Sequence, residues 1–256
     1  MLKETIPISV VKIGGSTLGS DDTSLRDIVA QHGKDRLYVV VHGGGALISQ
    51  WLDQLNIETT FLDGLRVTSE PALEVVISVL RGIVNTSLVS EMNSLGGRAV
   101  GLSGIDDQLI TARQTNSKLG LVGKITQVRP NILMHLLSEK YIPVIAPIGV
   151  EPPIQALNIN ADAAAGEIAR EIGADELIFL TDVDGLQNED GETLKVADKG
   201  LIQGLVRDGT LTGGMIPKTD ACLRAAEVGI KARIINGTKQ SALLSIESES
   251  NGTSVR

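Results

Sequence analysis

Glycine-rich segments follow two apolar runs within the first fifty residues of the sequence. The first is 10–16 (VVKIGGS) and the second is 39–45 (VVVHGGG). Glycine has no Cβ, so the backbone of such a segment can approach a ligand closely. A helix that begins there presents N–H donors and the positive end of its dipole to an anion. Both segments are therefore expected to bind oxyanions.

Two lysines accompany these glycines. Lys12 precedes the first pair, and Lys218 follows another pair in segment 213–218 (GGMIPK). A lysine at a strand end can simply extend to water, and His42 can simply satisfy a local hydrogen bond. Two lysines that converge on glycine-rich loops are instead typical of phosphoryl-transfer chemistry. The sequence contains neither G-x-x-x-x-G-K-[ST] nor G-x-G-x-x-G, which disfavours a P-loop or a dinucleotide site.

Two further segments place polar side chains beside turns. In 63–68 (DGLRVT), Arg66 could hold a carboxylate through two parallel hydrogen bonds or form a surface ion pair. In 158–162 (NINAD), Asn160 or Asp162 could cap a helix, and Asp162 could instead orient the two lysine ammonium groups. We favour this orienting role over that of a general base, because a carboxylate substrate is already ionised at neutral pH.

The later part of the chain has two segments that suit a nucleotide. Segment 180–186 (LTDVDGL) ends a buried strand with two acids and a glycine, which could contact nucleotide or Mg²⁺ or form an ordinary turn. Segment 210–215 (TLTGGM) leads into the helix that carries Lys218. This helix entry suits the phosphates of ATP.

The composition limits the classes of partner. The 256 residues are 42% hydrophobic, and their apolar runs are short, without a secretory signal, so a soluble cytoplasmic protein without membrane contact is expected. A formal net charge of −8 and 2% aromatic residues argue against nucleic acid as a partner. The single Cys222 cannot form an internal disulfide and is expected to pack as a small hydrophobe.

Short apolar runs alternate with segments long enough for helices. Apolar runs between helices indicate strands buried on both faces, so the expected fold class is α/β, a three-layer αβα sandwich with a mostly parallel central sheet. Segment 107–128 is expected to form antiparallel hairpins as a lid or rim. The expected strands are 8–13, 37–41, 98–102, 142–145, 176–181 and 231–235, and the expected helices are 21–32, 46–55, 70–94, 131–140, 160–172 and 215–228.

Four prolines between residues 143 and 153 mark the expected internal division of the chain. We expect one domain over 1–256, with an N-terminal lobe of about residues 1–150 and a C-terminal lobe of about residues 151–256. The reaction centre is expected between the two lobes.

Taken in order along the chain, these segments resemble the amino-acid kinase family. Each match is short, but together they span nearly the whole chain in the family's order. Within the family, DGLRVT points to members that act on N-acetyl-L-glutamate rather than on carbamate, uridylate, aspartate or glutamate. The matching segments are 12–15 (KIGG), 41–45 (VHGGG), 63–68 (DGLRVT), 101–104 (GLSG), 143–149 (PVIAPIG), 158–162 (NINAD), 180–185 (LTDVDG) and 213–218 (GGMIPK).

The resemblance implies a reaction and the place of each reactant. The acyl substrate would lie in the N-terminal lobe and ATP in the C-terminal lobe. The γ-phosphoryl of ATP would pass to the side-chain carboxylate of N-acetyl-L-glutamate, giving an acyl phosphate in arginine biosynthesis. Mg²⁺ would accompany ATP without a dedicated protein cage.

The resemblance also implies residue roles. Lys12 and Lys218 would stabilise the transition state, Asp162 would orient them, and Gly15 and Gly44 would donate N–H groups to the transferring oxygens. The acetylglutamate site would comprise Gly44, Gly45, Arg66 on the α-carboxylate, and Asn158. The nucleotide site would comprise Lys12, Gly14, Thr181, Asp182, Gly185, Leu186, Thr210, Leu211, Thr212 and Lys218.

Some features depart from the family pattern. Segment 128–131 (VRPN) differs from the Val-Asn-Pro common there, and Ile105 stands where lysine is common. The chain begins a few residues before its first expected strand, whereas arginine-inhibited members carry an additional N-terminal helix that joins dimers into a hexamer. An arginine-insensitive homodimer is therefore expected. Whether a PII-type regulator docks on this dimer is left open.

Two other functions compete with this interpretation. One is phosphorylation of aminoadipate or glutamate attached to a small carrier protein, which the negative net charge disfavours because such a carrier is acidic. The other is a catalytically silent member of the fold that binds a ligand. Lys12, Asp162 and Lys218 argue against the silent protein, because a binding protein does not need transition-state charges.

Overall fold

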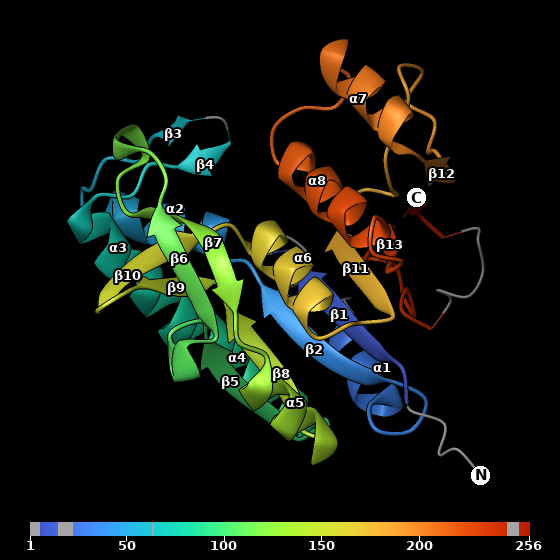
Figure 1. The fold of residues 1–256 in the computed structure, drawn as a ribbon, viewed down its shortest axis with the longest axis horizontal. Coiled ribbons are helices and arrows are strands. Elements are labelled where there is room, and N and C mark those ends of the chain that lie inside the picture. The colour runs from blue at the N-terminus through green and yellow to red at the C-terminus, as the bar shows by residue number, and fades with distance from the viewer. Residues whose placement is uncertain (1–5, 15–22, 63, 245–250) are drawn as a thin grey trace.

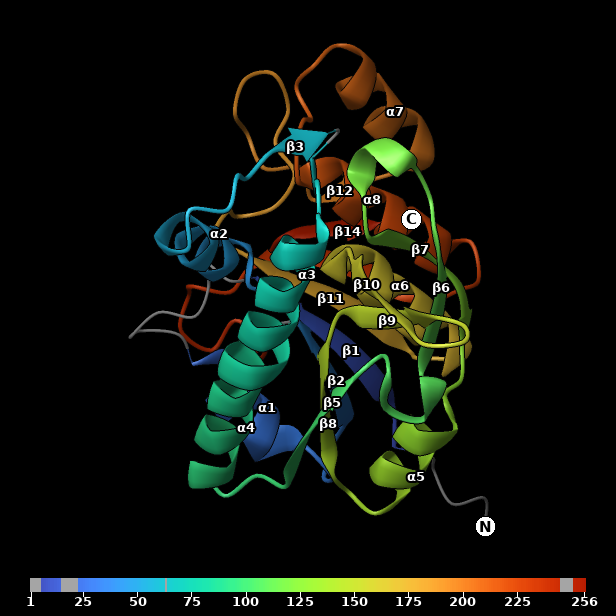
Figure 2. The same ribbon diagram turned by 90° about the vertical axis from the view of Figure 1, so that its left-hand side faces the viewer.

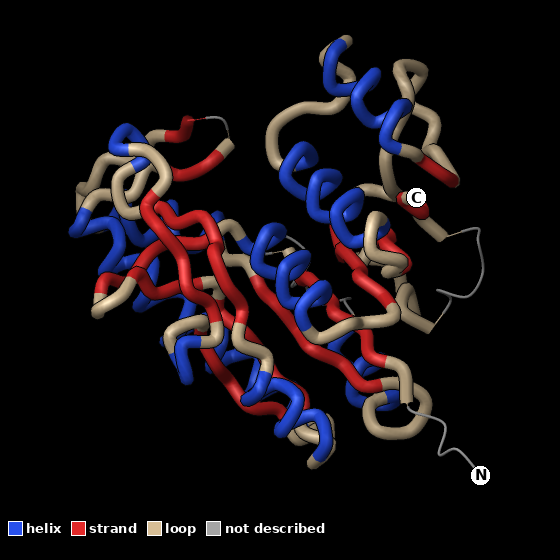
Figure 3. The backbone as a smooth tube through the Cα atoms, in the orientation of Figure 1, coloured by secondary structure: helices blue, strands red, loops and turns tan. Residues whose placement is uncertain are grey.

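An eight-stranded sheet runs through the middle of the molecule, in the order β12-β14-β13-β11-β1-β2-β8-β5 (Figures 1 and 3). This computed structural model describes residues 6–14, 23–62, 64–244 and 251–256. Neighbouring strands from β13 to β5 are parallel, and β14 is antiparallel to β13. The strands are β1 (Ile8–Ile13), β2 (Leu37–His42), β5 (Ala99–Ser103), β8 (Ile142–Ala146), β11 (Glu176–Thr181), β12 (Val196–Ala197), β13 (Lys231–Asn236) and β14 (Thr253–Val255).

Helices cover both faces of this sheet, so the expected three-layer αβα class is confirmed. In Figure 1, α6 and α8 lie in front of the sheet, and Figure 2 shows the long segment from α3 to α4 on the other side. The α-helices are α1 (Ser24–Gln31), α2 (Gly45–Gln54), α3 (Glu70–Ile77), α4 (Asn85–Ser94), α5 (Asn131–Ser138), α6 (Ala161–Glu171), α7 (Lys199–Arg207) and α8 (Met215–Ala226). Short 3₁₀ turns are η2 (Asp106–Gln108) and η3 (Ser117–Leu119).

The central strands supply two separate hydrophobic cores. On β1, Val10 belongs to the core beneath α5, α6 and α8, whereas Val11 and Ile13 belong to the core beneath α1, α2 and α3. Because successive side chains on a strand point to opposite faces, Lys12 lies on the same face as Val10. It therefore reaches the carboxyl end of the sheet on the side of α6 and α8.

A second, smaller sheet lies beside the first. Strands β6 (Ile110–Gln114) and β7 (Val122–Val128) pair antiparallel, which confirms the hairpin expected over 107–128. They close with β9 (Ile148–Glu151) and β10 (Gln155–Ile159) into a four-stranded barrel rather than standing alone as a lid. A short hairpin of β3 (Phe61–Leu62) and β4 (Leu65–Arg66) lies at the same end of the molecule (Figure 1).

All six strands expected from apolar runs are present, and so are the six expected helices. The prediction missed α7 and the strands β3, β4, β9, β10, β12 and β14. The proline cluster that suggested a division near residue 150 includes Pro152 and Pro153, which connect β9 to β10. The division into lobes stays a prediction.

Residues Glu70–Ser94 form one long helical segment that contains a π-helical turn, η1 (Ser78–Val84), between α3 and α4. By length and composition it could cross a membrane, with a mean hydropathy of 1.6 over 18 residues, but half of that window is buried within the fold. Val76, Leu80 and Met92 pack into the core on their side of the sheet. Such a core helix passes the same test, so the segment is weak evidence for a membrane.

Candidate active site

One carboxylate oxygen joins the two lysines that the sequence singled out. Oδ1 of Asp162 lies 2.9 Å from Nζ of Lys12 and 3.2 Å from Nζ of Lys218. All three side chains are about nine-tenths buried, with 12%, 8% and 8% of Lys12, Lys218 and Asp162 exposed. Two cations and one anion leave a net charge of +1 at this point.

Three elements bring these side chains together. Lys12 lies near the end of β1, Asp162 lies in the first turn of α6, and Lys218 lies in the first turn of α8. The Asn160 side chain caps α6 by accepting hydrogen bonds from the N–H groups of Asp162 and Ala163, at 3.0 and 2.9 Å. Asn160 is therefore the cap, and the Asp162 carboxylate is left for the lysines.

Burial and charge oppose each other in this triad. Burial by itself raises the pKa of Asp162, but the ammonium groups of Lys12 and Lys218 hold it below its ordinary value. Burial lowers the pKa of Lys218, and the Asp162 carboxylate opposes that change. The Lys218 Nζ atom also lies 4.9 Å from the centre of the Phe179 ring, which favours its charged form.

The second glycine-rich segment joins β2 to α2 beside this triad. The Gly43 N–H donates to the Ile13 carbonyl at 3.0 Å, which holds the segment against the end of β1. Helix α2 begins after Gly44 without a side-chain cap, and no atom lies within 4 Å of where a Cβ on Gly45 would be. The α2 N-terminus thus offers free N–H donors to an anion.

Arg66 approaches the same segment from β4. Its Nη2 donates to the Gly45 carbonyl at 2.9 Å and to Ser49 Oγ at 2.8 Å, while its Nη1 is buried without a partner. The guanidinium lies 4.8 Å from the centre of the Phe61 ring. Burial lowers the pKa of Arg66 from its ordinary value. A buried donor without a partner is unfavourable, so this nitrogen is suited to an incoming acceptor.

A hydrogen bond to Thr68 holds the Asn158 side chain in the cavity wall. Its Nδ2 donates to Thr68 Oγ1 at 3.0 Å, and the Thr68 hydroxyl donates to the Arg66 carbonyl at 3.0 Å. Thr68 is fully buried. Thr68 therefore connects the Asn158 side chain to the backbone of Arg66, the two residues that are expected to bind the acyl substrate.

A cavity of about 350 Å³ collects most of the expected residues. Its wall includes Lys12 and Asp162 at one side, and Gly44, Gly45, Arg66 and Asn158 around the rest. Lys218 is not part of the wall, but its Nζ donates to Asp162, which is. Gly214, just before α8, also lines the wall. The structure thus brings together the residues expected for transfer and for the acyl substrate.

The expected nucleotide residues after β11 are engaged by the fold itself. Thr181 Oγ1 donates to the Val183 carbonyl at 2.8 Å, and the Leu186 N–H donates to Thr253 Oγ1 at 2.8 Å. Leu186 is buried in the core, and Asp182 is exposed. Gly185 has φ 145°, and a Cβ there would lie 2.5 Å from Thr253 Oγ1, so the close approach of β14 explains this glycine.

Segment 210–212 connects α7 to α8. The Leu211 N–H donates to the Leu205 carbonyl at 2.8 Å, and the Leu211 side chain is buried. The Met215 N–H donates to the Thr212 carbonyl at 3.2 Å, and the Thr210 N–H donates to Asp208. Gly14 directly follows β1, whereas Gly15 lies outside the described residues. The nucleotide roles of all these residues stay predictions.

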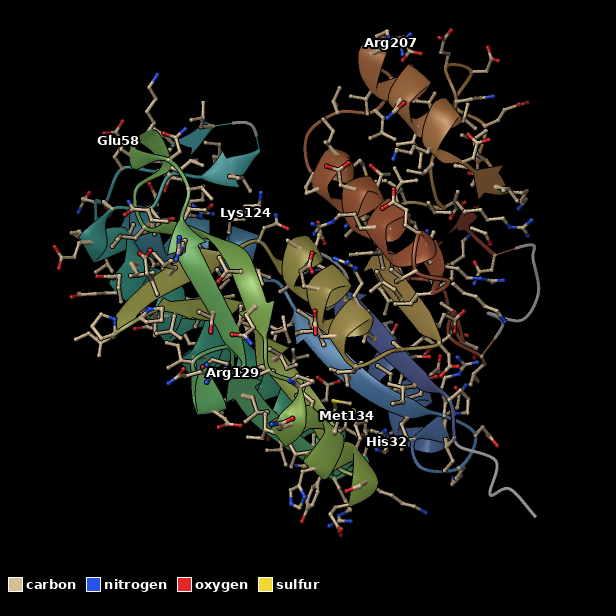
Figure 4. The ribbon with its side chains drawn as sticks, in the orientation of Figure 1. His32, Glu58, Lys124, Arg129, Met134 and Arg207 are labelled. Atoms are coloured by element: carbon tan, nitrogen blue, oxygen red, sulfur yellow. The ribbon has the colours of Figure 1, made fainter. Side chains whose placement is uncertain are left out.

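A larger cavity of about 730 Å³ lies between β7 and the helices α6, α7 and α8. Lys124 of β7 and Arg207 of α7, both labelled in Figure 4, contribute to its wall. Lys12, Asp162 and Lys218 do not line it. Size alone would thus select a cavity that the Lys12, Asp162 and Lys218 side chains do not line.

Ser49 and Phe61 escaped the sequence-based prediction, whereas Gly43, Thr68 and Gly214 lie in segments that the sequence singled out but received no individual role. Ser49 carries a signal that was available, because it lies four positions after Gly45 and therefore on the same face of α2. Phe61 carries no such signal, since its contact with Arg66 depends on the hairpin.

Known proteins share this sequence and architecture. The model of the amino acid kinase family matches residues 7–236. An acetylglutamate kinase of Ruegeria pomeroyi is 44% identical over 241 residues, covering 93% of this chain and 84% of that protein. A chloroplastic acetylglutamate kinase of Arabidopsis thaliana is 44% identical over 244 residues, covering 92% and 70%.

The architecture agrees with the sequence match. The crystal structure of smu.665 from Streptococcus mutans UA159 superposes with a TM-score of 0.83, at 27% identity, and covers 97% of this chain and 98% of that one. The family match extends over most of the sheet, and the buried triad and glycine segments lie within it. The chain therefore belongs to the amino acid kinase family.

Proposed function

We propose that this protein is an ATP-dependent kinase that transfers the γ-phosphoryl group to the side-chain carboxylate of N-acetyl-L-glutamate. The products are N-acetyl-L-glutamyl 5-phosphate and ADP, and the step belongs to arginine biosynthesis. The observation that carries the proposal is the shared cavity of Lys12, Asp162 and Arg66, which supplies a charge site and a buried free donor together. The relatives named acetylglutamate kinase support the same reaction.

The acyl substrate is bound by donors at two places. Arg66 Nη1 donates to the α-carboxylate, and the bonds from Nη2 to Gly45 and Ser49 keep the guanidinium in place. Asn158 and the N–H groups at the start of α2 contact the rest of the molecule. This arrangement directs the side-chain carboxylate towards Lys12 and Lys218.

Transfer depends on position and charge rather than on a base. The substrate carboxylate is already ionised near pH 7 and attacks the γ-phosphorus directly. Lys12 and Lys218 neutralise the charge that develops on the transferring oxygens, and the N–H groups of Gly44 and Gly15 add donors. Asp162 holds both ammonium groups in place, so little reorganisation is needed during the reaction.

ATP is the donor in this proposal because the relatives are kinases. Gly214 lines the cavity just before α8, where the Met215 and Ile216 N–H groups donate to the Thr212 and Gly213 carbonyls, so the phosphates meet the positive end of the α8 dipole and the Lys218 ammonium. Among the described residues, no group of three or more His, Cys, Asp or Glu side chains is placed to hold a metal ion. In this proposal Mg²⁺ is held by the phosphates of ATP and by water.

The test is ADP release from Mg-ATP with N-acetyl-L-glutamate, measured in parallel with glutamate, aspartate, carbamate and UMP. Turnover with N-acetyl-L-glutamate alone is the expected result. Turnover with another acceptor would reassign the substrate. No turnover with any acceptor would favour a carrier-linked aminoadipate or glutamate substrate, or a silent binding protein.

We further propose a cytoplasmic homodimer with an N-terminal lobe for the acyl substrate and a C-terminal lobe for ATP. These proposals rest on the resemblance to the family and on the composition. Light scattering coupled to gel filtration tests the dimer. A PII-type regulator stays a prediction to be tested by adding such a protein to the kinase assay.

A further inference from the structure

The π-helical turn η1 faces the glycine-rich segment of the site. In this turn the Asn85 N–H donates to the Leu80 carbonyl, five residues back, so these two residues lie one above the other. A Cβ on Gly44 would lie 2.8 Å from Leu80 Cδ2, and the Asn85 side chain lies 3.1 Å from His42. The turn thus directs two side chains at residues 42–44.

The contacts of Asn85 determine the orientation of its amide group. Nδ2 donates to the Val144 carbonyl at 2.9 Å, and Oδ1 accepts from Arg81 Nη1 at 3.0 Å. A carbonyl can only accept and a guanidinium can only donate, so the oxygen and nitrogen cannot be exchanged. The second proton of Nδ2 has two neighbours, Nε2 of His42 at 3.1 Å and the Leu102 carbonyl at 3.5 Å, and the shorter contact makes Nε2 the acceptor.

The same logic determines the tautomer of His42. Its Nδ1 lies 3.0 Å from the Gly43 carbonyl oxygen, which can only accept, so Nδ1 carries the proton. Burial lowers the pKa of His42 to about 4, so the ring is neutral near pH 7. The side chain is fully buried and therefore lies behind the glycine segment rather than in solvent.

The peptide unit held by His42 contains the donor that the reaction needs. The Gly43 carbonyl and the Gly44 N–H belong to one peptide group, which is planar and trans, so they point in opposite directions. When His42 holds the carbonyl, the Gly44 N–H must point away from His42. Space for the Asn85 amide depends on Gly101, where a Cβ would lie 2.1 Å from Asn85 Oδ1.

We propose that Asn85 and His42 are positioning residues, in which Asn85 selects the Nδ1–H tautomer of His42 and His42 orients the Gly43–Gly44 peptide towards the transferring phosphoryl group. This inference rests on the proposed function, because it assigns the Gly44 N–H to phosphoryl transfer. Neither side chain touches the reactants. Their effect reaches the reaction through one peptide group.

The tautomer is tested first, by ¹⁵N NMR of histidine-labelled full-length protein, which contains three histidines. We expect the His42 resonances of a ring protonated at Nδ1 in the unsubstituted protein, and loss of that preference in Asn85→Ala. A ring protonated at Nε2 in the unsubstituted protein would overturn the proposal without any use of activity or of a variant.

The kinetic test compares Asn85→Ala with Asn93→Ala. Asn93 lies on the same helical segment and bonds to the Ala99 backbone, but it has no contact with the glycine segment. Loss of one oriented hydrogen bond predicts a kcat about tenfold lower in Asn85→Ala. The KM for N-acetyl-L-glutamate should change by less than about twofold, because the Arg66 and Asn158 contacts remain. Asn93→Ala should keep the original kcat.

A double-mutant cycle separates positioning from general destabilisation. The Nδ2 of an asparagine can take the place of His Nδ1 and has no tautomers, so His42→Asn should retain a large part of the activity. In that background Asn85→Ala should lower kcat by no more than about twofold. Equal losses of kcat in both backgrounds, or equal losses in Asn85→Ala and Asn93→Ala, would contradict the proposal. Circular dichroism at the assay temperature verifies that each variant is folded.

The outcome for this inference is distinguishable from that for the proposed function. If the unsubstituted protein releases no ADP with N-acetyl-L-glutamate, the proposed substrate is wrong, and the cycle is run with the acceptor that the substrate panel identifies. If it releases ADP and Asn85→Ala does so equally well, the substrate stands and the positioning role is wrong.

Discussion

Asp162 is the residue on which the charge balance of the cavity depends. A single carboxylate oxygen accepts from both Lys12 and Lys218, so the two ammonium groups are held within reach of one point. Without it, two buried cations would repel each other. Asp162 offsets this repulsion, and it opposes the lowering of the Lys218 pKa by burial.

Lys218→Met should lower kcat by roughly 10²- to 10³-fold, because the lysine contacts charge that develops in the transition state. Steady-state ADP release measures kcat, and calorimetric titration measures the affinity for N-acetyl-L-glutamate, which should be nearly unchanged. Lys34→Met is the matched control, since Lys34 is exposed and bonds only to the Ala30 carbonyl. An unchanged kcat in Lys218→Met would remove this residue from the mechanism.

Arg66→Lys should raise the KM for N-acetyl-L-glutamate by about tenfold or more, because one ammonium cannot replace Nη1 and Nη2 together. In the unsubstituted protein Nη2 is occupied by Gly45 and Ser49, and Nη1 is the donor left for the substrate. The initial rate at varied substrate gives KM. Arg98→Lys is the control, since Arg98 is an exposed arginine that stacks on Tyr141. If KM stays the same in Arg66→Lys, then Arg66 has a structural role only.

At the scale of elements, the sequence predicts what depends on local pattern. The continuous apolar runs of β1 and β11 identify strands buried on both faces, and their bounds agree with prediction. Helix α7 was missed because two of its nine residues are glycine and only Ile202 and Leu205 are buried. Strands β9 and β10 were missed because their pairing surrounds two prolines that appeared to end the structure.

The candidate site shows the same limit. Lys12, Asp162 and Lys218 could each be selected by type and by the glycines or helix starts near them. Their meeting point depends on the neighbouring positions of β1 and β11 and on the helices α6 and α8 that cover this face. The π-helical turn could not be predicted, because segment 78–84 (SVLRGIV) lies within one long helical stretch and contains no proline that would mark an irregular turn.

The connection from β11 to β14 gives a prediction at the scale of elements. Gly185 combines a φ of 145° with a Cβ position only 2.5 Å from Thr253 Oγ1. Gly185→Ala should lower the unfolding free energy by about 1–3 kcal/mol because of the backbone conformation alone. The close contact with Thr253 should lower it further. Urea unfolding followed by circular dichroism measures the loss.

Gly191→Ala is the control for this connection, because Gly191 has φ 79° but no neighbouring atom within 4 Å of its Cβ position. Its loss should be the smaller one, since only the backbone conformation is disfavoured. Equal losses in the two variants would mean that β14 moves readily to accept a methyl group at position 185.

At the scale of the whole molecule, the sheet divides the interior into two cores, and burial in the fold affects two of the histidines. Burial lowers the pKa of His32 and of His42 from 6.5 to about 4. In the unfolded chain both rings regain the ordinary value. Between pH 6.5 and pH 4 the unfolded chain therefore binds protons that the folded protein does not bind.

The unfolding free energy should consequently be highest above pH 6.5 and fall as the pH falls towards 4. For the fully buried His42 the shift corresponds to about 3 kcal/mol, and the partly exposed His32 should contribute less.

Glu176 acts in the opposite direction, because burial raises its pKa and its contribution grows as the pH falls. The contributions of the two histidines outweigh that of the one carboxyl, so the unfolding free energy should be lower at pH 5 than at pH 7. Urea unfolding at the two pH values would measure this difference. His42→Asn should reduce this pH dependence, because it removes the buried imidazole. Equal stability at both pH values would mean that His42 is not held neutral behind the glycine segment.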